Sequence, residues 1–547
     1  MITRLGVEDR NLNSTYSVNP KKNADTQNLA FKGGWALPLL LKGIQECEKN
    51  PMVNVAVIDL FSAILPRTFV ESLTNWFAGF EALRRESSGL IVNCLIPSFI
   101  TLGIAKLLNN FIMPKGSNMS GCWADSSLIE RASEMYKSSN GDKVKDTFKE
   151  IISNIEGVDG KKRIVAKDVL TKAEIETMAE ELKALSKSSA DKKQFTQKIE
   201  SITNHIVEKT HVYENITVGS GEKAIKASNV KTLLEDSTKF FKEFRKAGHN
   251  VSIEEFAKQS KKLVGTKSAL GLLVVLPLAA SMQYINRWLT EKMSGVKGAP
   301  IYDDFGKDQN EEVKQKSKEG LMKQKIISIS SMLAVGFASM MKLPKWSMFE
   351  FKGMFPTMDQ ARLISTTTFA SRMAAADDKN ELAEATTRDI ATFLSLYFLG
   401  DYAAKGTATI IEKKLGIKLL NDMKPLEEGA GPLKRFWHWM KNVNIKSSEE
   451  VVSKTAEELK AKGLTPNKEQ AEKIAKELKR AVNLRSACQV ASIGVSLVLL
   501  GLIIPIWTRS KTKKKHAEAL QQVQTASSNV NDIGNDKEAK TLPTQQA

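Results

Sequence analysis

The sequence predicts an all-α protein, a multi-pass helical membrane protein with additional charged, extramembrane helical regions. The stretch 486–508 holds eleven Val, Leu and Ile residues and no charged residue. Other long apolar segments precede it, and Lys or Arg flanks nearly all of them. Segments rich in Lys and Glu, with helical spacing of their apolar residues, separate these apolar segments. Membrane spans alternating with polar helical regions account for all three observations.

The composition is basic, with large polar regions. The 547 residues include 80 Lys and Arg against 62 Asp and Glu, a formal charge of +18. This excess favours an anionic membrane surface or nucleic acid as a partner. The mean hydropathy of −0.25 indicates that any membrane part is diluted by polar sequence. The four cysteines stand apart without a CxxC pair, so zinc and a disulfide framework are not indicated.

The apolar and charged segments suggest a division of the chain into regions. Residues 1–33 are expected to be a disordered N-terminal tail. The next regions are 34–116, with interfacial amphipathic helices and a first span at about 87–108; 117–262, a charged all-helical extramembrane region; 263–412, a membrane region with candidate spans 268–287, 326–342 and 390–411; 413–485, a charged or amphipathic helical region; 486–508, the last span; and 509–547, a basic and then disordered tail.

Helical spacing and capping signals support the prediction for 117–262. Thr171 with Glu174 has the spacing of a capping box, in which each side chain satisfies a free backbone N–H of the first helical turn. One apolar helix face is formed by Phe195, Ile199, Ile202 and Ile206. The charged helix before residue 486 runs into the last span without a breaker, so one long helix is expected there.

The last span is the segment that needs least help to insert. Its apolar residues contribute on the order of −3 to −7 kcal/mol on the insertion scale. For 390–411 the apolar residues contribute about −2 to −5 kcal/mol, while Asp401 and Lys405 together cost about +5 to +7 kcal/mol. That segment should not insert alone.

Three interpretations of Asp401 and Lys405 remain open. At i, i+4 they can pair along one helix face. The segment can instead lie on the surface or be half-inserted, or the two charges can line an ion or substrate path. Asp59, in an amphipathic segment that ends or kinks at Pro66, has the same alternatives, with the interfacial helix favoured.

Tryptophans at segment ends support membrane residence over burial in a soluble core. Amphipathic indole rings concentrate at the headgroup level of a bilayer. Three apolar segments end near a Trp with a neighbouring cation: Trp288 beside Arg287, Trp346 beside Lys345, and Trp507 beside Arg509. A Trp that closes the end of a soluble core helix is the alternative.

Two basic motifs are candidate membrane-surface contacts. In PLKRFWHWMKNV, Trp437 shares an apolar helix face that Lys434, Arg435 and Lys441 flank, as in a helix lying on an anionic membrane; the alternative is a helix packed on another domain. The second motif follows Trp507 and consists of Arg509, Lys511, Lys513, Lys514 and Lys515. Directly after a span, such a cluster is better explained by anionic headgroups than by nucleic acid, and it favours a cytoplasmic C-terminus.

Signatures of catalysis are weak throughout the sequence. VGSGEKA lacks the spacing of a phosphate-binding loop, and His205, Glu208 and His211 do not form HExxH. No catalytic, cofactor-binding or metal-binding residue is assigned, and no cofactor is expected.

Three classes of function remain open. The first is a membrane-anchored scaffold or interaction protein, whose charged helices bind a protein partner or self-associate. The second is a transporter or channel component that uses Asp401, Lys405 and Asp59. The third is a membrane-bound enzyme without a recognisable motif. The default location is a bacterial cytoplasmic membrane, because no cleavable targeting segment indicates another.

Overall fold

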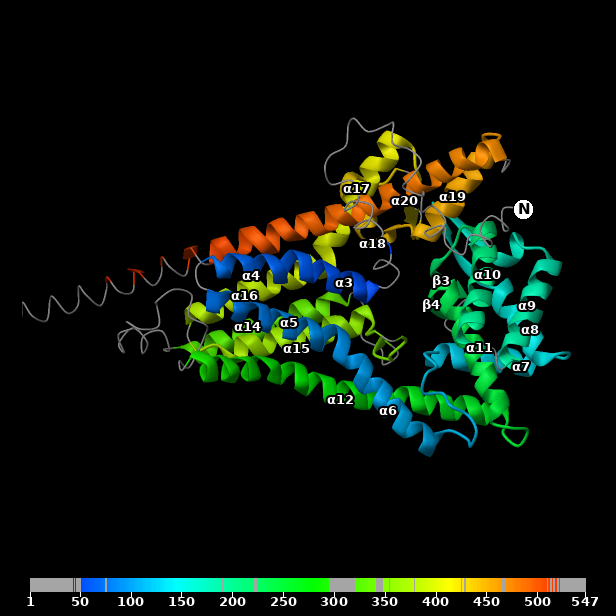
Figure 1. The fold of residues 1–547 in the computed structure, drawn as a ribbon, viewed down its shortest axis with the longest axis horizontal. Coiled ribbons are helices and arrows are strands. Elements are labelled where there is room, and N and C mark those ends of the chain that lie inside the picture. Colours follow the sequence, from blue (N-terminus) through cyan, green and yellow to red (C-terminus); the bar gives the residue numbers. More distant parts are fainter. Residues whose placement is uncertain are drawn as a thin grey trace, which may run out of the picture.

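The computed structural model describes residues 51–73, 76–188, 191–219, 224–294, 320–340, 348–353, 355–377, 379–424, 426, 429–464 and 468–508, with positions 43 and 45 and scattered positions from 510 to 521. This part of the chain is mostly helical and divides into a long bundle and a head at one end of it (Figure 1). We call the opposite end of the bundle the far end.

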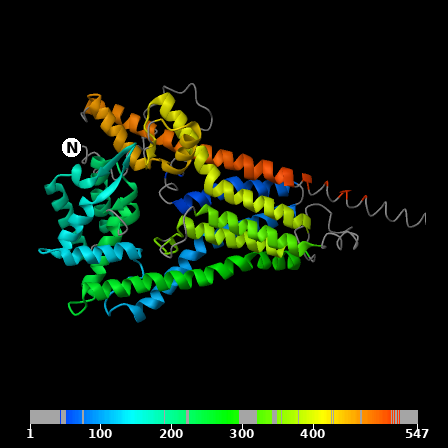
Figure 2. The same ribbon diagram turned by 180° about the vertical axis from the view of Figure 1, so that it is seen from behind.

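Within the described residues, seven helical passes run between the head and the far end, and the two opposite views agree on this arrangement (Figures 1 and 2). Successive passes alternate in direction, and four contain a π-helical turn, labelled η. The passes are α3 (Pro51–Asp59), η1 (Leu60–Ile64) and α4 (Leu65–Ser72); α5 (Trp76–Leu90), η2 (Ile91–Leu95) and α6 (Ile96–Ile112); α12 (Ile253–Ser294); α14 (Leu321–Ser339); α15 (Met358–Ala375); α16 (Lys379–Leu394), η6 (Ser395–Leu399) and α17 (Gly400–Leu415); and α20 (Lys468–Ser496) with η7 (Leu497–Ile503).

Glycines allow the passes to approach one another closely. A Cβ on Gly336 of α14 would lie 2.3 Å from Oγ1 of Thr366 on α15. A Cβ on Gly501 of η7 would lie 2.7 Å from Cβ of Pro66 on α4. Small residues at helix contacts are typical of membrane bundles, in which packing rather than the hydrophobic effect holds the helices together.

The head is built from two stretches of the chain. The first contains α7 (Ser126–Ser138), α8 (Lys143–Ser153), β1 (Ile155–Asp159), β2 (Lys162–Val165), η3 (Ala166–Asp168, a 3₁₀ turn), α9 (Lys172–Lys187), α10 (Lys192–Thr210), β3 (Glu214–Val218), β4 (Ile225–Asn229) and α11 (Val230–Lys246). The second contains β5 (Leu420–Asp422), α18 (Pro432–Asn442), β6 (Val443–Ile445) and α19 (Ser448–Ala461).

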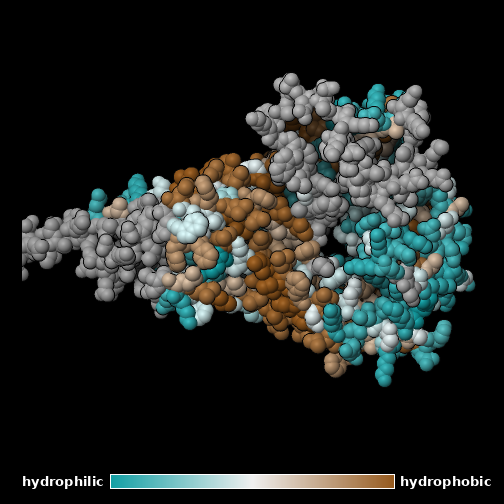
Figure 3. All heavy atoms as spheres, in the orientation of Figure 1, coloured by the Kyte–Doolittle hydropathy of each residue, from teal (hydrophilic) through white to brown (hydrophobic). Residues whose placement is uncertain are grey.

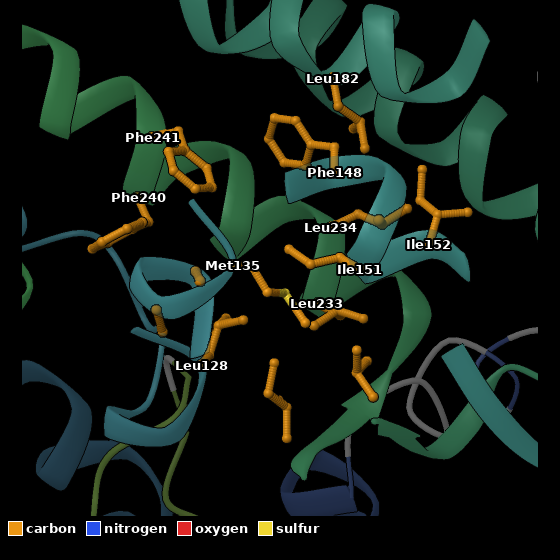
Figure 4. Close-up of a cluster of buried hydrophobic side chains, with 14 of the residues drawn as sticks. Leu128, Met135, Phe148, Ile151, Ile152, Leu182, Leu233, Leu234, Phe240 and Phe241 are labelled. Carbon is orange, nitrogen blue, oxygen red and sulfur yellow. The ribbon is translucent and has the colours of Figure 1, made fainter. Parts of the chain in front are cut away.

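The first stretch encloses the largest apolar core of the described chain (Figure 4). Phe148 of α8 and Phe240 and Phe241 of α11 are fully or almost fully buried. The predicted capping box of Thr171 and Glu174 is present at the start of α9. The predicted apolar face of α10 is buried along its length: Phe195, Ile199, Ile202 and Ile206. The first turns of α12 complete this core, so α12 passes from the head core into the bundle without a break.

The head also contains β-structure that the all-helical prediction for 117–262 does not include. Four antiparallel strands pair in the order β2-β1-β3-β4, and β5 pairs with β6. Asp159–Gly160 lies at the β1–β2 hairpin, where Gly160 has a φ of +65°. This Asp-Gly pair is a strong hairpin signal. Short strands between long helices were missed because helical periodicity dominates the region.

Four helices of the described chain are long and apolar enough to cross a membrane: Met52–Ser72, Trp76–Ile112, Ile253–Met293 and Gln470–Thr508. Three of them contain the predicted spans 87–108, 268–287 and 486–508, and the last is the single long helix that the sequence predicts. The first occupies sequence for which an interfacial helix is predicted. The predicted span 326–342 lies in α14 as far as residue 339, and residues 341 and 342 lie outside the described chain. Neither α14 nor the helix that holds 390–411 is among the four, because Lys323 and Lys325 lie in the first turns of α14 and Asp401 and Lys405 interrupt the other.

Candidate functional site

An ionic network lies inside the bundle toward its far end. Arg67 of α4 faces Glu86 of α5, with Nη1 3.3 Å from Oε1. Nη2 of Arg372 on α15 lies 3.2 Å from the other oxygen of Glu86, and its Nη1 lies 3.2 Å from Oδ1 of Asp389 on α16. All four side chains are buried, and Asp389 is 0 % exposed. Alternating charges therefore connect four passes of the bundle.

Further charged residues of α5 extend the network toward α12. Arg84 donates to the carbonyl oxygen of Asn286 at 3.0 Å and to Oγ1 of Thr290 at 2.5 Å. Arg85 lies 3.6 Å from the carboxylate of Glu81, and Arg84 lies 3.9 Å from it. The pass α12 is thus the fifth to be connected to the network, through the carbonyl group of Asn286 and the hydroxyl group of Thr290.

The network continues along α16 and toward α3. Arg388 lies 3.3 Å from Asp389 and 4.0 Å from Glu384. Asp59 interacts electrostatically with Glu86 and Arg67. Five guanidinium groups therefore form ion pairs with four carboxylates: Arg67, Arg84, Arg85, Arg372 and Arg388 with Glu81, Glu86, Glu384 and Asp389. Because arginine does not deprotonate in proteins, removing one member leaves a buried charge without compensation.

A second polar level contains the π-helical turns η1, η2 and η6. Asp59 immediately precedes η1. In η6 the hydroxyl of Tyr397 lies 2.9 Å from that of Ser365 on α15, and Asn93 of η2 accepts a hydrogen bond from Thr368 at 2.9 Å. A π-turn shifts the backbone hydrogen bonds by one residue, and such turns recur at functional sites. Asp59 is therefore close both to the ionic network and to this level.

Asp401 and Lys405 lie elsewhere, on α17 near the head. Oδ2 of Asp401 is 2.8 Å from Nζ of Lys405. Lys405 is buried, whereas Asp401 is exposed. Nζ of Lys405 also lies 3.5 Å from the carbonyl oxygen of Met440 on α18 and 5.5 Å from the ring centre of Tyr402. The structure brings this pair together on one helix face and covers the lysine with α18.

The basic helix α18 lies on the surface of the described chain. Leu433 and Trp437 are 72 % and 51 % exposed. Lys434, Arg435 and Lys441 are exposed as well, and Nζ of Lys441 lies 5.7 Å from the ring centre of Trp437. The four candidate surface residues of this motif therefore share one helix.

The basic cluster after the last span is only partly described. Trp507 is half exposed at the far end, and Nζ of Lys511 lies 4.8 Å from its ring centre. Lys511 and Lys514 are exposed. Arg509, Lys513 and Lys515 lie outside the described residues, as does Trp346.

The two stretches of the head meet at a polar seam. Nζ of Lys446 lies 2.5 Å from Oδ1 of Asp159, and Lys446 is 1 % exposed. Oε1 of Glu450 accepts hydrogen bonds from the backbone N–H groups of Tyr213 and Glu214, at 2.8 and 3.0 Å. Asn421 accepts a hydrogen bond from the Gly160 N–H at 2.8 Å, next to this group. The seam thus joins 420–453 to β1 and β3 through buried, satisfied polar groups.

The seam shifts the pKa values of its acids in opposite directions. Burial raises the pKa of the Glu450 carboxyl above its ordinary value and outweighs the backbone hydrogen bonds that it accepts. For Asp159, burial also acts to raise the pKa, but the hydrogen bonds from Lys446 and Lys454 prevail and lower it. Burial lowers the pKa of the neighbouring His211 imidazole.

Neither the ionic network nor the seam is among the site residues predicted from sequence, apart from Asp59. A local signal for the network exists, because Glu81 and Arg85 stand at i, i+4 directly before the first predicted span. The other members of the network are distant in the sequence. Arg372 lies 286 residues after Glu86, and Asp389 lies a further 17 residues along the chain. No local pattern connects such distant residues.

Comparisons with known proteins give no family for this chain. No protein-family model matches it, and neither the curated proteins nor the solved structures contain a match. Among the described residues, no group of three or more His, Cys, Asp and Glu side chains is placed to hold a metal ion. Function is therefore inferred from the geometry of the chain.

Proposed function

We propose that this chain is a multi-pass integral membrane protein that anchors a rigid head as an interaction scaffold. The apolar surface on the face of the bundle seen in Figure 3 carries this proposal. On α12 a run of exposed large apolar residues extends from Leu270 to Trp288, and Met293 is exposed beyond it. At about 1.5 Å per residue these 18 steps cover about 27 Å, against a hydrocarbon core of about 30 Å.

Two other passes have exposed apolar runs of similar length. On α20 and η7 the run extends from Val490 to Trp507, about 26 Å, and on α14 from Met322 to Phe337, about 23 Å. Trp76, Trp288 and Trp507 are all at least half exposed and lie in the far half of the bundle. This arrangement fits an aromatic belt at one membrane interface.

Seven membrane crossings fit the packing of the head better than the five predicted spans. The two head stretches contact each other, so an even number of crossings must separate them. The predicted spans 268–287, 326–342 and 390–411 would supply three and would place the stretches on opposite sides. The pass α15 supplies the fourth crossing. It is buried inside the bundle, where its many hydroxyl groups are tolerated, but these groups make its sequence too polar to be recognised as a span.

This topology puts the head and the C-terminal tail on opposite faces of the membrane. With the cytoplasmic C-terminus favoured by the basic cluster after Trp507, the head would lie on the outer face of a bacterial cytoplasmic membrane. A reporter fused after Ala547 and a cysteine at the exposed Lys193 of α10 test it. Accessibility from opposite faces is expected, and accessibility of both from one face would contradict the seven crossings.

The scaffold function draws on the rigidity of the head. α12 and α20 extend from the head into the bundle, and buried polar groups close the seam between the two head stretches. Such a head can present its charged helices at a fixed height above the membrane. Site-specific photo-crosslinkers on α10 should capture a defined partner or a second copy in cells. Crosslinks restricted to lipid at every α10 position would contradict the scaffold function.

A second candidate function is ion or proton transport through the level of Asp59. Asp59 directly precedes the π-turn η1 and interacts electrostatically with Cys94 of η2 and Tyr397 of η6, and carboxylates inside membrane bundles commonly mark ion pathways. Flux into liposomes should be measured for the unchanged chain, Asp59→Asn and Asp401→Asn. Flux lost with assembly intact favours transport. A chain without flux, or with flux that neither variant alters, would contradict it.

A further inference from the structure

The surface helix α18 lies at the level where the last pass changes from charged to apolar sequence. Nε1 of Trp439 donates to Oγ1 of Thr409 on α17 at 3.3 Å. Immediately before Thr409, Ala408 packs in one buried cluster with Ala481 and Cys488 of α20. The uncharged stretch of α20 begins at 486, within that interval. In the proposed topology, α18 therefore sits at the membrane interface on the head side.

The inner face of α18 is fixed to the rest of the protein. Nε2 of His438 lies 3.1 Å from Oδ1 of Asp422 and 2.5 Å from the carbonyl oxygen of Lys424. The carbonyl oxygen of Met440 lies 3.5 Å from Nζ of Lys405. These contacts hold the helix in one orientation. The side chains on its other face are therefore presented at a fixed place.

The outer face of α18 combines large apolar side chains with cations. Leu433, Phe436 and Trp437 are each more than half exposed. Lys434 and Lys441 lie beside Leu433 and Trp437 on the helix surface, at spacings of one to four residues, and both are exposed. The helix itself, Pro432–Asn442, contains no acidic residue. Apolar anchors between cations are complementary to the headgroup layer of an anionic bilayer.

We infer that α18 docks on the anionic headgroup layer of the membrane that the bundle spans, with Leu433, Phe436 and Trp437 inserted below the phosphates. This inference rests on the proposed membrane function and names a lipid partner for this helix. Because the helix contacts α17 and the β5–β6 sheet, lipid binding would also orient the head relative to the membrane surface. No bond is made or broken in this step.

Lipid quenching of fluorescent labels tests the inference on the full chain. Cys94, Cys122 and Cys488 are buried, so Cys47→Ser leaves an introduced cysteine as the preferred labelling site. The label is placed by L433C on α18, L502C on η7 or K193C on α10, in nanodiscs containing spin-labelled lipid. One set of discs contains only phosphatidylcholine, and the other also contains phosphatidylglycerol.

The expected result is quenching of the L502C label in both sets, no quenching of the K193C label, and quenching of the L433C label that is strong only with phosphatidylglycerol. Each cation near an anionic surface changes the equilibrium constant of docking by about fivefold. Adding K434Q and K441Q should therefore lower that constant by about 25-fold, which a titration of phosphatidylglycerol content measures as a loss of L433C quenching. The matched control, K192Q with K193Q in the head, should leave that quenching unchanged.

The label positions separate failure of this inference from failure of the proposed function. An unquenched L502C label would contradict membrane spanning itself. A quenched L502C label with an unquenched L433C label would overturn only the docking of α18, and shielding of L433C from aqueous quenchers would then indicate a protein contact. Equal quenching of L433C in both sets would overturn the preference for anionic lipid.

Discussion

The bundle and the head differ in where they place charged and exposed apolar side chains. The head encloses Phe148, Phe240 and Phe241 in an apolar core and keeps most of its charges outside. The bundle buries the Arg67–Glu86–Arg372–Asp389 network and exposes apolar side chains along its length. Water drives the first arrangement, whereas the second suits a surrounding in which apolar surface costs nothing and polar groups must satisfy one another. The two arrangements thus match the two surroundings, water and lipid, that the proposed membrane protein requires.

Breaking the ionic network should have the largest effect on stability. Arg372→Met leaves Glu86 and Asp389 buried without their shared cation, which should cost about 3–5 kcal/mol. Unfolding of the purified chain by denaturing detergent in mixed micelles measures this loss. Arg480→Met is the matched control, because Arg480 is exposed and its pair with Glu477 is worth at most about 0.5 kcal/mol. Equal losses for the two variants would show that the network does not hold the bundle together.

Lys446→Met should open the seam of the head and leave the bundle unaffected. Asp159 loses its buried partner but keeps Lys454 at 2.9 Å, so we expect a smaller loss of about 2–3 kcal/mol. Hydrogen exchange at the Tyr213 and Glu214 amides, which Glu450 covers, should accelerate, while exchange in α15 should not. Faster exchange in both parts would show that bundle and head unfold as one unit.

Close packing in the bundle can be tested within one pass. Gly501→Leu forces a side chain against Pro66 and should cost about 1–3 kcal/mol. Gly494 of α20 has no atom within 4 Å of an added Cβ, so Gly494→Leu should be neutral or slightly stabilising. Detergent-induced unfolding of both variants gives the comparison. A neutral Gly501→Leu would indicate a looser bundle than these contacts imply.

A buried acid makes the head sensitive to pH. Burial raises the pKa of the Asp236 carboxyl from its ordinary value of 3.8 to about 7. The folded head therefore binds more protons than the unfolded chain between these values, and its stability falls as the pH rises through this window. We expect a loss of about 1–2 kcal/mol between about pH 5.5 and pH 7. Asp236→Asn should remove this dependence in hydrogen exchange of α11, and an unchanged profile would assign it to other groups.

Sequence patterns correctly predicted features that depend on residues close together in the sequence. Periodicity located α10 and the long helix that ends in the last span, and spacing located the capping box at Thr171. They missed the helices and ion pairs whose positions depend on residues far apart in the sequence. α15 has too many hydroxyl groups to be recognised as a bundle helix, and it is positioned by contacts such as Arg372 with Glu86, which are 286 residues apart. The Asp-Gly hairpin and the capping box of Thr357 and Gln360 at the start of α15 are local signals that were missed.

The seam also constrains how the protein is made. Tyr213 and Glu214 leave the ribosome well before Glu450, which is 236 residues beyond Glu214. At about 5–20 residues per second, the gap is about 10–50 s. During this time the first head stretch has its own core, but the Tyr213 and Glu214 amides that Glu450 will cover are still exposed. Meanwhile α12, α14, α15 and α16 are still joining the bundle. A nascent chain stalled before residue 450 should therefore present these amides to chaperones or proteases, and completion of the chain should hide them.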